Sequence, residues 1–285
     1  MAILIDGKQA SREIRDALQA EAAKLKATSG TVPGLAVILV GENPASRIYV
    51  GSKEKACREA GFLSRVFRLP AETAERDILK RIHMLNDDRK IHGILVQLPL
   101  PAHIRAQAVI EAIDPHKDVD GFHPYNAGLL FSGTPLHRAC TPLGIITLLD
   151  RYGIVVEGKE AVIVGRSNIV GKPLALMLLS GHATVTVCHT RTKNLPEVTR
   201  RAEILVAAAG KAEMIRADMV REGAVVIDVG VNRNADGRLV GDVEFAGVAE
   251  KASHITPVPG GVGPMTIAML LKNTLQAVGY KDRLV

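Results

Sequence analysis

Apolar and polar positions alternate along the first 100 residues with the periods of helices and strands in turn. The expected elements, in chain order, are a helix over 9–28, a strand over 35–40, a helix over 46–60 with Ser46 as its N-cap, a strand over 62–69, a helix over 74–86 and a strand over 93–97. The order β-α-β-α-β predicts a parallel sheet with right-handed crossovers.

After a break, the same alternation resumes. Asp, Gly, Pro and His dominate residues 114–140, where we expect loops and the start of a linker. The elements expected beyond it are a helix from Thr141, a strand over 160–165, a helix over 171–180, strands over 183–188, 204–208 and 224–230, and a terminal helix from Pro264 at position N1 to about Gly279. This spacing is typical of a Rossmann-type sheet.

Chain length supports a division at this break. At 285 residues, the chain exceeds a typical single domain of roughly 100–150 residues. We therefore expect an α/β protein of two domains, one over 1–140 and a Rossmann-type domain over 141–264.

Charge and cysteine content narrow the class of protein. The net charge is only +6 and no block of Lys and Arg occurs, which disfavours nucleic acid as a partner. Cys57, Cys140 and Cys188 are widely spaced and form no metal-ligand cluster. No signal peptide and no membrane span is expected, because each apolar stretch is broken before it reaches about 20 residues. We expect a cytosolic protein.

A glycine-containing turn follows the strand at 160–165. Gly165 allows a sharp turn, and Gly171 allows the next helix to lie close to the sheet, so that its first amides face a pyrophosphate. An ordinary βα loop is the alternative. The candidate cofactor residues are Gly165, Arg166, Ser167, Val170, Gly171, Pro173, His189, Thr190, Arg191 and Val231.

The second strand of this domain favours NADP over NAD. An NAD site usually has Asp or Glu at its end, whereas His189, Thr190 and Arg191 bring no carboxylate. Arg166 and Arg191 are suited to a 2′-phosphate. The alternative is that Arg191 only solvates a loop.

Candidate reactive residues lie mainly in the first domain. Tyr49 and Lys53 stand four apart on one helix face. Short-chain dehydrogenases use such a pair too, but there the nucleotide turn precedes it. Gln97 ends a parallel strand, where ligands collect in α/β sheets. Asp118 and Asp120 share one loop, for which a turn or helix cap is the alternative.

The loop over 256–266 holds three glycines and three prolines, which suggests backbone that approaches a ligand. A plain connector is the alternative reading of this loop.

Five segments together resemble the bifunctional methylenetetrahydrofolate dehydrogenase/cyclohydrolase family over essentially the whole chain. They are Tyr49-x-x-x-Lys53, 97–101 (QLPLP), 118–121 (DVDG), 165–173 (GRSNIVGKP) and 259–266 (PGGVGPMT). Two departures are small: Ala139 stands where Pro is common, and Thr190 stands where Ser is frequent.

The resemblance implies a homodimer of two α/β domains around a cleft, with a helix over 265–285 packing back on the first domain. It implies NADP as cofactor and tetrahydrofolate one-carbon derivatives as substrates. Lys53 would do the acid–base work of hydrolysis, Gln97 would hold its amine, Tyr49 would stack on the aminobenzoyl ring, and Asp120 would bind the pterin. The implied substrate-binding residues are Tyr49, Gln97, Leu98, Pro99, Asp120, Pro259, Gly260 and Gly261.

Two alternatives remain open at this point. A monofunctional methylenetetrahydrofolate dehydrogenase would share the fold but lack rapid hydrolysis. An NADP-binding regulator without catalysis would keep the nucleotide turn and have no need of Tyr49, Lys53, Gln97 and Asp120 together.

Overall fold

The computed structural model describes residues 2–281, which fall into two compact units. We call residues 12–140 with 267–281 the N-unit, and residues 2–11 with 141–266 the C-unit. Residues 282–285, the end of the expected terminal helix, lie outside the described residues.

The N-terminal residues belong to the C-unit, whereas the sequence placed them with residues 12–140. Strand β1 (Ile3–Leu4) pairs in parallel with β11 (His254–Ile255). The Ile5 amide continues this ladder by donating to the Ile255 carbonyl at 2.9 Å. A strand of two residues is too short to produce a recognisable alternation.

A three-stranded parallel sheet forms the centre of the N-unit. Its order is β3 (Leu63–Leu69), β2 (Gly34–Val40), β4 (Gly93–Val96), which confirms the predicted β-α-β-α-β arrangement. All seven residues of β2 are buried. A central parallel strand is covered on both faces, so its sequence is apolar throughout.

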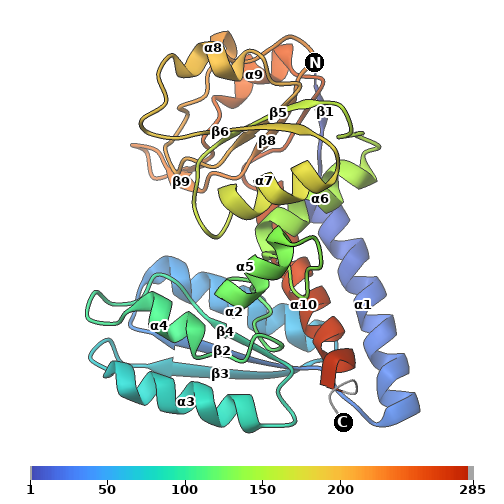
Figure 1. Cartoon of the computed structure of the whole chain (residues 1–285), viewed down its shortest axis with the longest axis vertical. Coiled ribbons are helices and arrows are strands. Elements are labelled where there is room, and N and C mark those ends of the chain that lie inside the picture. The colour runs from blue at the N-terminus through green and yellow to red at the C-terminus, as the bar shows by residue number, and fades with distance from the viewer. Residues whose placement is uncertain (1, 282–285) are drawn as a thin grey trace. The chain divides into compact units, whose positions relative to one another are not determined.

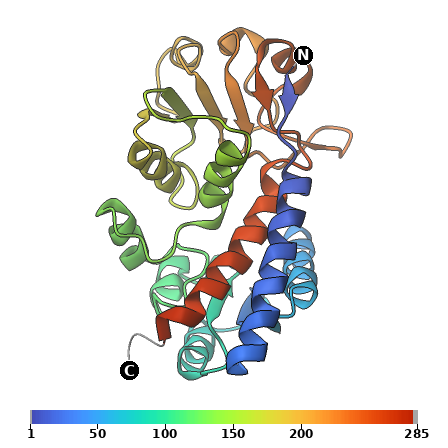
Figure 2. The same cartoon turned by 90° about the vertical axis from the view of Figure 1, so that its right-hand side faces the viewer.

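Helices cover both faces of this sheet. On one face, α3 (Glu75–Asp87) and α4 (Ala106–Glu111) contribute Ile78, Ile82 and Val109 to a core shared with β2. Helix α2 (Pro44–Glu59) packs against β2 and β3. The N-unit parts of α1 (Gly7–Ser29) and α10 (Val262–Lys281) run side by side (Figure 1, Figure 2).

Three local expectations were wrong. The N-cap of α2 is Asn43, whose side chain accepts from the Ser46 amide at 3.0 Å, with Pro44 as the first helical residue. The region 114–140 contains α5 (Pro124–Phe131) in addition to loops. Helix α10 begins at Val262, so Pro264 is its third residue rather than its first.

The C-unit is built on a six-stranded parallel sheet, as expected of a Rossmann-type domain. The order is β1, β11, β8 (Val225–Asp228), β7 (Ile204–Ala207), β5 (Glu160–Val164) and β6 (Thr184–Cys188). A two-stranded hairpin, β9 (Asn232–Arg233) with β10 (Leu239–Val240), follows β8. The chain moves from β5 to one side with β6 and then to the other side with β7, which creates a switch point at the end of β5.

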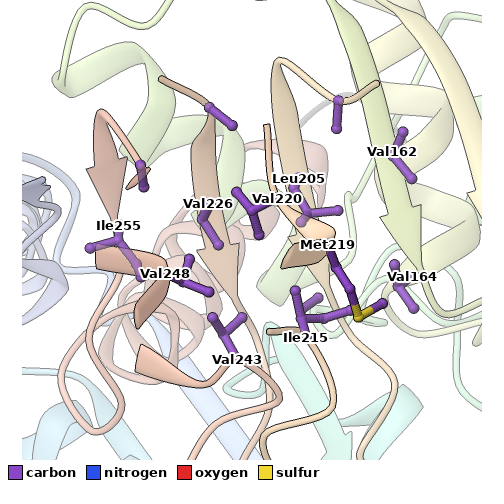
Figure 3. Close-up of a cluster of buried hydrophobic side chains, with 14 of the residues drawn as sticks. Val162, Val164, Leu205, Ile215, Met219, Val220, Val226, Val243, Val248 and Ile255 are labelled. Atoms are coloured by element: carbon purple, nitrogen blue, oxygen red, sulfur yellow. The ribbon is translucent and has the colours of Figure 1, made fainter. Parts of the chain in front are cut away.

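The main core of the C-unit lies on one face of this sheet. Figure 3 shows Val162, Leu205, Val226 and Ile255, one from each of four neighbouring strands, gathered with other apolar side chains. The covering elements are α8 (Leu195–Thr199), η1 (Ala217–Met219) and α9 (Phe245–Lys251). Helices α6 (Cys140–Arg151) and α7 (Gly171–Ser180) lie on the opposite face (Figure 1). In the described part of the chain, no helix is long and apolar enough to cross a membrane.

Candidate functional site

Lys53 and Gln97 form the centre of the candidate site in the N-unit. Lys53 lies on α2 and is only 6% exposed. Its Nζ donates to Gln97 Oε1 at 3.0 Å, and Gln97 Nε2 donates to the Leu98 carbonyl at 2.7 Å. Because the amide nitrogen is held by Leu98, the amide oxygen faces the ammonium. The backbone amide of Gln97 continues the β4–β2 ladder by donating to Ile38, so the pair rests on rigid sheet structure.

Tyr49 lies one helical turn before Lys53, on the same face of α2. It is half-buried, and burial raises the pKa of its phenol above the ordinary value. Beyond Gln97, Leu98 is half-buried and Pro99 is exposed, and the peptide bond between them is cis. The structure thus brings Tyr49, Lys53 and the start of the 97–101 segment together through α2 and the end of β4.

The two aspartates of the 118–121 segment have different environments. Asp118 is buried, and its Oδ2 accepts from the His123 amide and from Asn126 Nδ2, both at 2.8 Å. Asp118 therefore stabilises its own loop, which agrees with the alternative that the aspartates of this segment serve a turn or a helix cap. Among the described residues, no backbone amide donates to the Asp120 carboxylate, so the backbone does not engage its oxygens.

Electrostatics single out Asp120 further. Burial raises the pKa of the Asp120 carboxyl to about 6, and the negative charge of Asp118 adds to the rise. The nearby Lys53 ammonium and the neighbouring Cys140 thiol act in the opposite direction. The carboxyl is therefore ionised at neutral pH but protonates in mild acid.

The structure adds two residues that sequence reasoning did not single out. Cys140 is buried beside Asp120, and its Sγ donates to the Val119 carbonyl at 3.2 Å. Asn273 on α10 donates through Nδ2 to the Val119 and Arg138 carbonyls at 2.8 and 2.9 Å. Since Asn273 lies more than 130 residues away along the chain, no local pattern connects it to this loop.

In the C-unit, the turn after β5 requires its two glycines. Gly165 has φ +135°, and a Cβ there would lie 2.1 Å from the Ala208 carbonyl oxygen. A Cβ on Gly171 would lie 2.1 Å from the Gly165 carbonyl oxygen. The turn is consequently packed against the end of β7 and against the first turn of α7, and Pro173 is buried within that helix.

Free amides lie within this turn rather than at the start of α7. Ser167 Oγ accepts from the Val170 and Gly171 amides, and the Ser167 carbonyl accepts from the Lys172 amide. Residues 166–169 are exposed, and their amides make no hydrogen bond within the described residues. A run of unpaired amides between two glycines that admit no side chain fits the phosphates of a nucleotide.

The cationic residues expected near a 2′-phosphate are exposed at the same edge of the sheet. Arg166 follows β5, and Thr190 and Arg191 follow the neighbouring strand β6. His189 Nδ1 accepts from the Arg191 amide at 3.1 Å, which fixes the backbone of that turn. In the described part of the chain, neither arginine forms an ion pair with a carboxylate.

The remaining expected residues also belong to the C-unit. Val231 is exposed just beyond β8. Pro259 is exposed, whereas Gly260 and Gly261 are buried against the start of α1. The Gly260 carbonyl accepts from the Lys8 amide at 3.0 Å, and a Cβ on Gly7 would lie 1.8 Å from the Gly261 carbonyl oxygen. Packing on α1 therefore accounts for part of the glycine content of this loop.

Comparison with known proteins covers both units. Residues 5–120 match the family "Tetrahydrofolate dehydrogenase/cyclohydrolase, catalytic domain", and residues 139–282 match the NAD(P)-binding domain of the same family. The "Bifunctional protein FolD" of Pelobacter propionicus is 57% identical over 277 residues, which cover 97% of this chain and 98% of that protein.

Solved structures give the same result. The bifunctional methylenetetrahydrofolate dehydrogenase/cyclohydrolase FolD from Campylobacter jejuni is 51% identical with a TM-score of 0.97, covering 99% of this chain and 100% of that one. The Trypanosoma brucei enzyme, complexed with NADP cofactor and an inhibitor, is 38% identical with a TM-score of 0.95, covering 99% of each chain. The chain belongs to the tetrahydrofolate dehydrogenase/cyclohydrolase family.

Proposed function

We propose that this protein oxidises 5,10-methylenetetrahydrofolate with NADP and hydrolyses the 5,10-methenyl product to 10-formyltetrahydrofolate. The observation that carries the proposal is the buried Lys53 Nζ held by Gln97, beside an Asp120 carboxyl that no backbone amide engages. A buried amine and a carboxyl that titrates near neutrality are suited to proton transfer and to binding a polar heterocycle.

The oxidation needs little chemistry from the protein. The nicotinamide, when bound, would supply the two-electron acceptor for a hydride from the methylene carbon. The product is a methenyl cation whose charge is shared by the two folate nitrogens. The residues of this chain have to hold the two reactants in line, which is worth a large factor in rate when the geometry is rigid.

The hydrolysis makes the larger demand on side chains. Water adds to the cationic carbon and loses one proton, which gives a neutral carbinolamine. The ring then opens: the bond from this carbon to one nitrogen breaks and that nitrogen takes up a proton, while the hydroxyl loses its remaining proton to form the formyl C=O on the other nitrogen, so one proton is released overall. We assign to Lys53 the removal of the proton from water and the delivery of a proton to the leaving nitrogen. Gln97 orients the Lys53 amine through its amide oxygen, because its amide nitrogen donates to the Leu98 carbonyl and so fixes the amide group.

Folate binding in the N-unit falls to side chains around this pair. The half-buried Tyr49 ring offers a face to the aminobenzoyl group, and Leu98 and Pro99 are assigned to the same substrate. The Asp120 carboxylate accepts hydrogen bonds from the amino-pyrimidine edge of the pterin. Pro259, Gly260 and Gly261 of the C-unit are assigned to the substrate on the resemblance alone.

NADP is the proposed cofactor. The residues assigned to its pyrophosphate are Gly165, Ser167 and Gly171, and Arg166, Thr190 and Arg191 are assigned to the 2′-phosphate. The absence of a carboxylate partner on Arg166 or Arg191, within the described residues, supports this choice. The Trypanosoma brucei relative is complexed with NADP. From the resemblance we further propose a homodimer, which sedimentation of the purified protein tests, and from the cysteine content we propose a cytosolic location.

A single assay separates the proposed function from its alternatives. Purified protein is given methylenetetrahydrofolate with NADP or NAD, and reduced nucleotide and methenyl product are followed together. We expect reduction of NADP in preference to NAD, with little methenyl compound accumulating. Equal build-up of both products would mean a dehydrogenase without rapid hydrolysis, and NADP binding without reduction would mean a regulator.

A further inference from the structure

The C-unit contains two buried aspartates that take no part in the proposed chemistry. Asp228 is the last residue of β8, and Asp242 lies just beyond β10. Asp242 is 0% exposed and Asp228 is 4% exposed. Neither forms an ion pair in the described part of the chain. Burying a carboxylate costs free energy unless hydrogen bonds compensate for the lost water. The hydrogen-bond donors around these two aspartates therefore indicate their role.

The Asp242 carboxylate accepts hydrogen bonds from the backbone of the loop after β7. Its Oδ2 accepts from the amides of Ala209 and Gly210 at 2.5 and 2.9 Å, and its Oδ1 accepts from the Lys211 amide at 2.9 Å. Three consecutive amides therefore point inward at one side chain, although residues 209–211 are exposed.

The same carboxylate also holds the loop after β8. Asn232 Nδ2 donates to Asp242 Oδ1 at 2.8 Å. Asp228 then fixes Asp242 itself, because Asp228 Oδ1 accepts from the amides of Asp242 and Gly230, both at 2.9 Å. Asp242 is thus the point at which the loops after β7 and β8 are tied together.

Glycines mark how closely the chain surrounds these carboxylates. A Cβ on Gly230 would lie 2.3 Å from Asp242 Oδ1, and a Cβ on Gly241 would lie 1.8 Å from Asp228 Oδ2. The backbone at Gly230 and Gly241 therefore passes too close to the two carboxylates to leave room for a side chain.

These loops lie at the switch point of the sheet. Strand β7 neighbours β5, and the Ala208 carbonyl oxygen meets Gly165 of the nucleotide turn at a distance that excludes a Cβ. In doubly wound sheets, ligands bind at this position. Strand β6, which Thr190 and Arg191 follow, is on the other side of β5.

We propose that Asp242 is a positioning residue for the dinucleotide, and that it acts through the backbone of residues 209–211 and through Asn232. It serves the part of the cofactor that NADP and NAD share, because the residues expected near the 2′-phosphate follow β5 and β6, whereas the groups that Asp242 holds follow β7 and β8. The inference rests on the proposed cofactor.

The test is calorimetric titration of NADP, and separately of NAD, into the full-length protein. Asp242→Asn keeps the side-chain shape, but its one acceptor oxygen cannot serve four donors. We expect it to weaken both nucleotides by the same factor, about 10-fold or more. Nucleotide-free hydrolysis of the methenyl substrate should stay at the wild-type rate. Asp236→Asn, an exposed aspartate of the same segment, should leave both affinities unchanged.

Each other outcome has a defined meaning. A folded Asp242→Asn protein that binds both nucleotides normally, or that weakens NADP alone, would overturn the inference. If this variant does not fold, Asn232→Ala decides, with an expected loss of about threefold for both nucleotides; unchanged affinity would then overturn it. A wild-type protein that binds neither nucleotide would remove the proposed cofactor as well.

Discussion

Asp120 in the N-unit and Asp242 in the C-unit both lie outside the helices and strands, yet their surroundings are opposite. Asp242 accepts four hydrogen bonds, three of them from consecutive backbone amides. Asp120 receives none from the backbone of the described residues, and burial raises the pKa of its carboxyl to about 6. A carboxylate whose oxygens are used by its own chain shapes the fold, whereas one left with spare acceptors is available to a ligand.

The same difference separates the two units as a whole. The N-unit presents side chains: an amine, an amide, a phenol and a carboxyl around α2 and the end of β4. The C-unit presents backbone: exposed amides in a turn from which side chains are excluded at Gly165 and Gly171. We therefore expect substitutions in the N-unit to change folate chemistry and those in the C-unit to change nucleotide affinity.

The largest effect is expected at Lys53. Lys53→Met removes the amine while keeping the bulk of the side chain, so hydrolysis of the methenyl substrate should fall by about 10²–10⁴-fold. Stopped-flow absorbance of that substrate measures the rate. Lys55→Met, on the exposed side of the same helix, is the control and should hydrolyse normally. Hydrolysis at the wild-type rate by Lys53→Met would contradict the assignment of the proton transfers to Lys53.

Arg191 should give the next largest effect. Arg191→Ala should raise the dissociation constant for NADP by about 10- to 100-fold, the worth of a lost charged hydrogen bond, and leave that for NAD unchanged. Titration calorimetry gives both constants, with Arg200→Ala as a surface control. Equal weakening of the two nucleotides would show that Arg191 does not contact the 2′-phosphate.

The pH dependence of folate binding tests Asp120. Its pKa is raised to about 6, so the carboxylate is ionised above that pH and protonated below it. Since the ionised form is the hydrogen-bond acceptor, the affinity for folate should be constant from pH 7 to 8 and fall about tenfold per unit well below pH 6. Asp120→Asn should bind weakly and lose this dependence. The same inflection in Asp120→Asn would assign it to another group.

A smaller effect is expected at Asn273, which ties the Asp120 loop to α10. Asn273→Ala leaves the Val119 and Arg138 carbonyls without this donor, so the KM for folate should rise about fivefold. The affinity for NADP should not change, and Gln276→Ala, exposed on the same helix, should be neutral. A matching loss of NADP affinity would indicate general destabilisation instead.

Elements with strong apolar runs were predictable from the sequence, and those set by tertiary contacts were not. Strand β2 was predicted to within one residue because burial on both faces makes it continuously apolar. The N-cap of α2 was misplaced because Asn43 and Ser46 are both good capping residues, and only the following Pro44 at N1 separates them. Strand β1 was not recognised because two residues are too few to show an alternation of apolar and polar positions.

For the candidate site, the resemblance gave one pair of partners, because Gln97 was expected to hold the Lys53 amine. The hydrogen bond between Lys53 and Gln97 agrees with that expectation. Asp242 and Asn273 were not identified, because each acts on backbone groups that are brought near only by folding. Such residues have no local signature of composition or spacing.

The most direct test of the division between the units compares two variants in two assays. Lys53→Met and Arg191→Ala are each measured for NADP affinity by calorimetry and for hydrolysis of the methenyl substrate without nucleotide. The account predicts that Lys53→Met binds NADP normally but does not hydrolyse, and that Arg191→Ala hydrolyses normally but binds NADP weakly. Loss of both properties in both folded variants would contradict it.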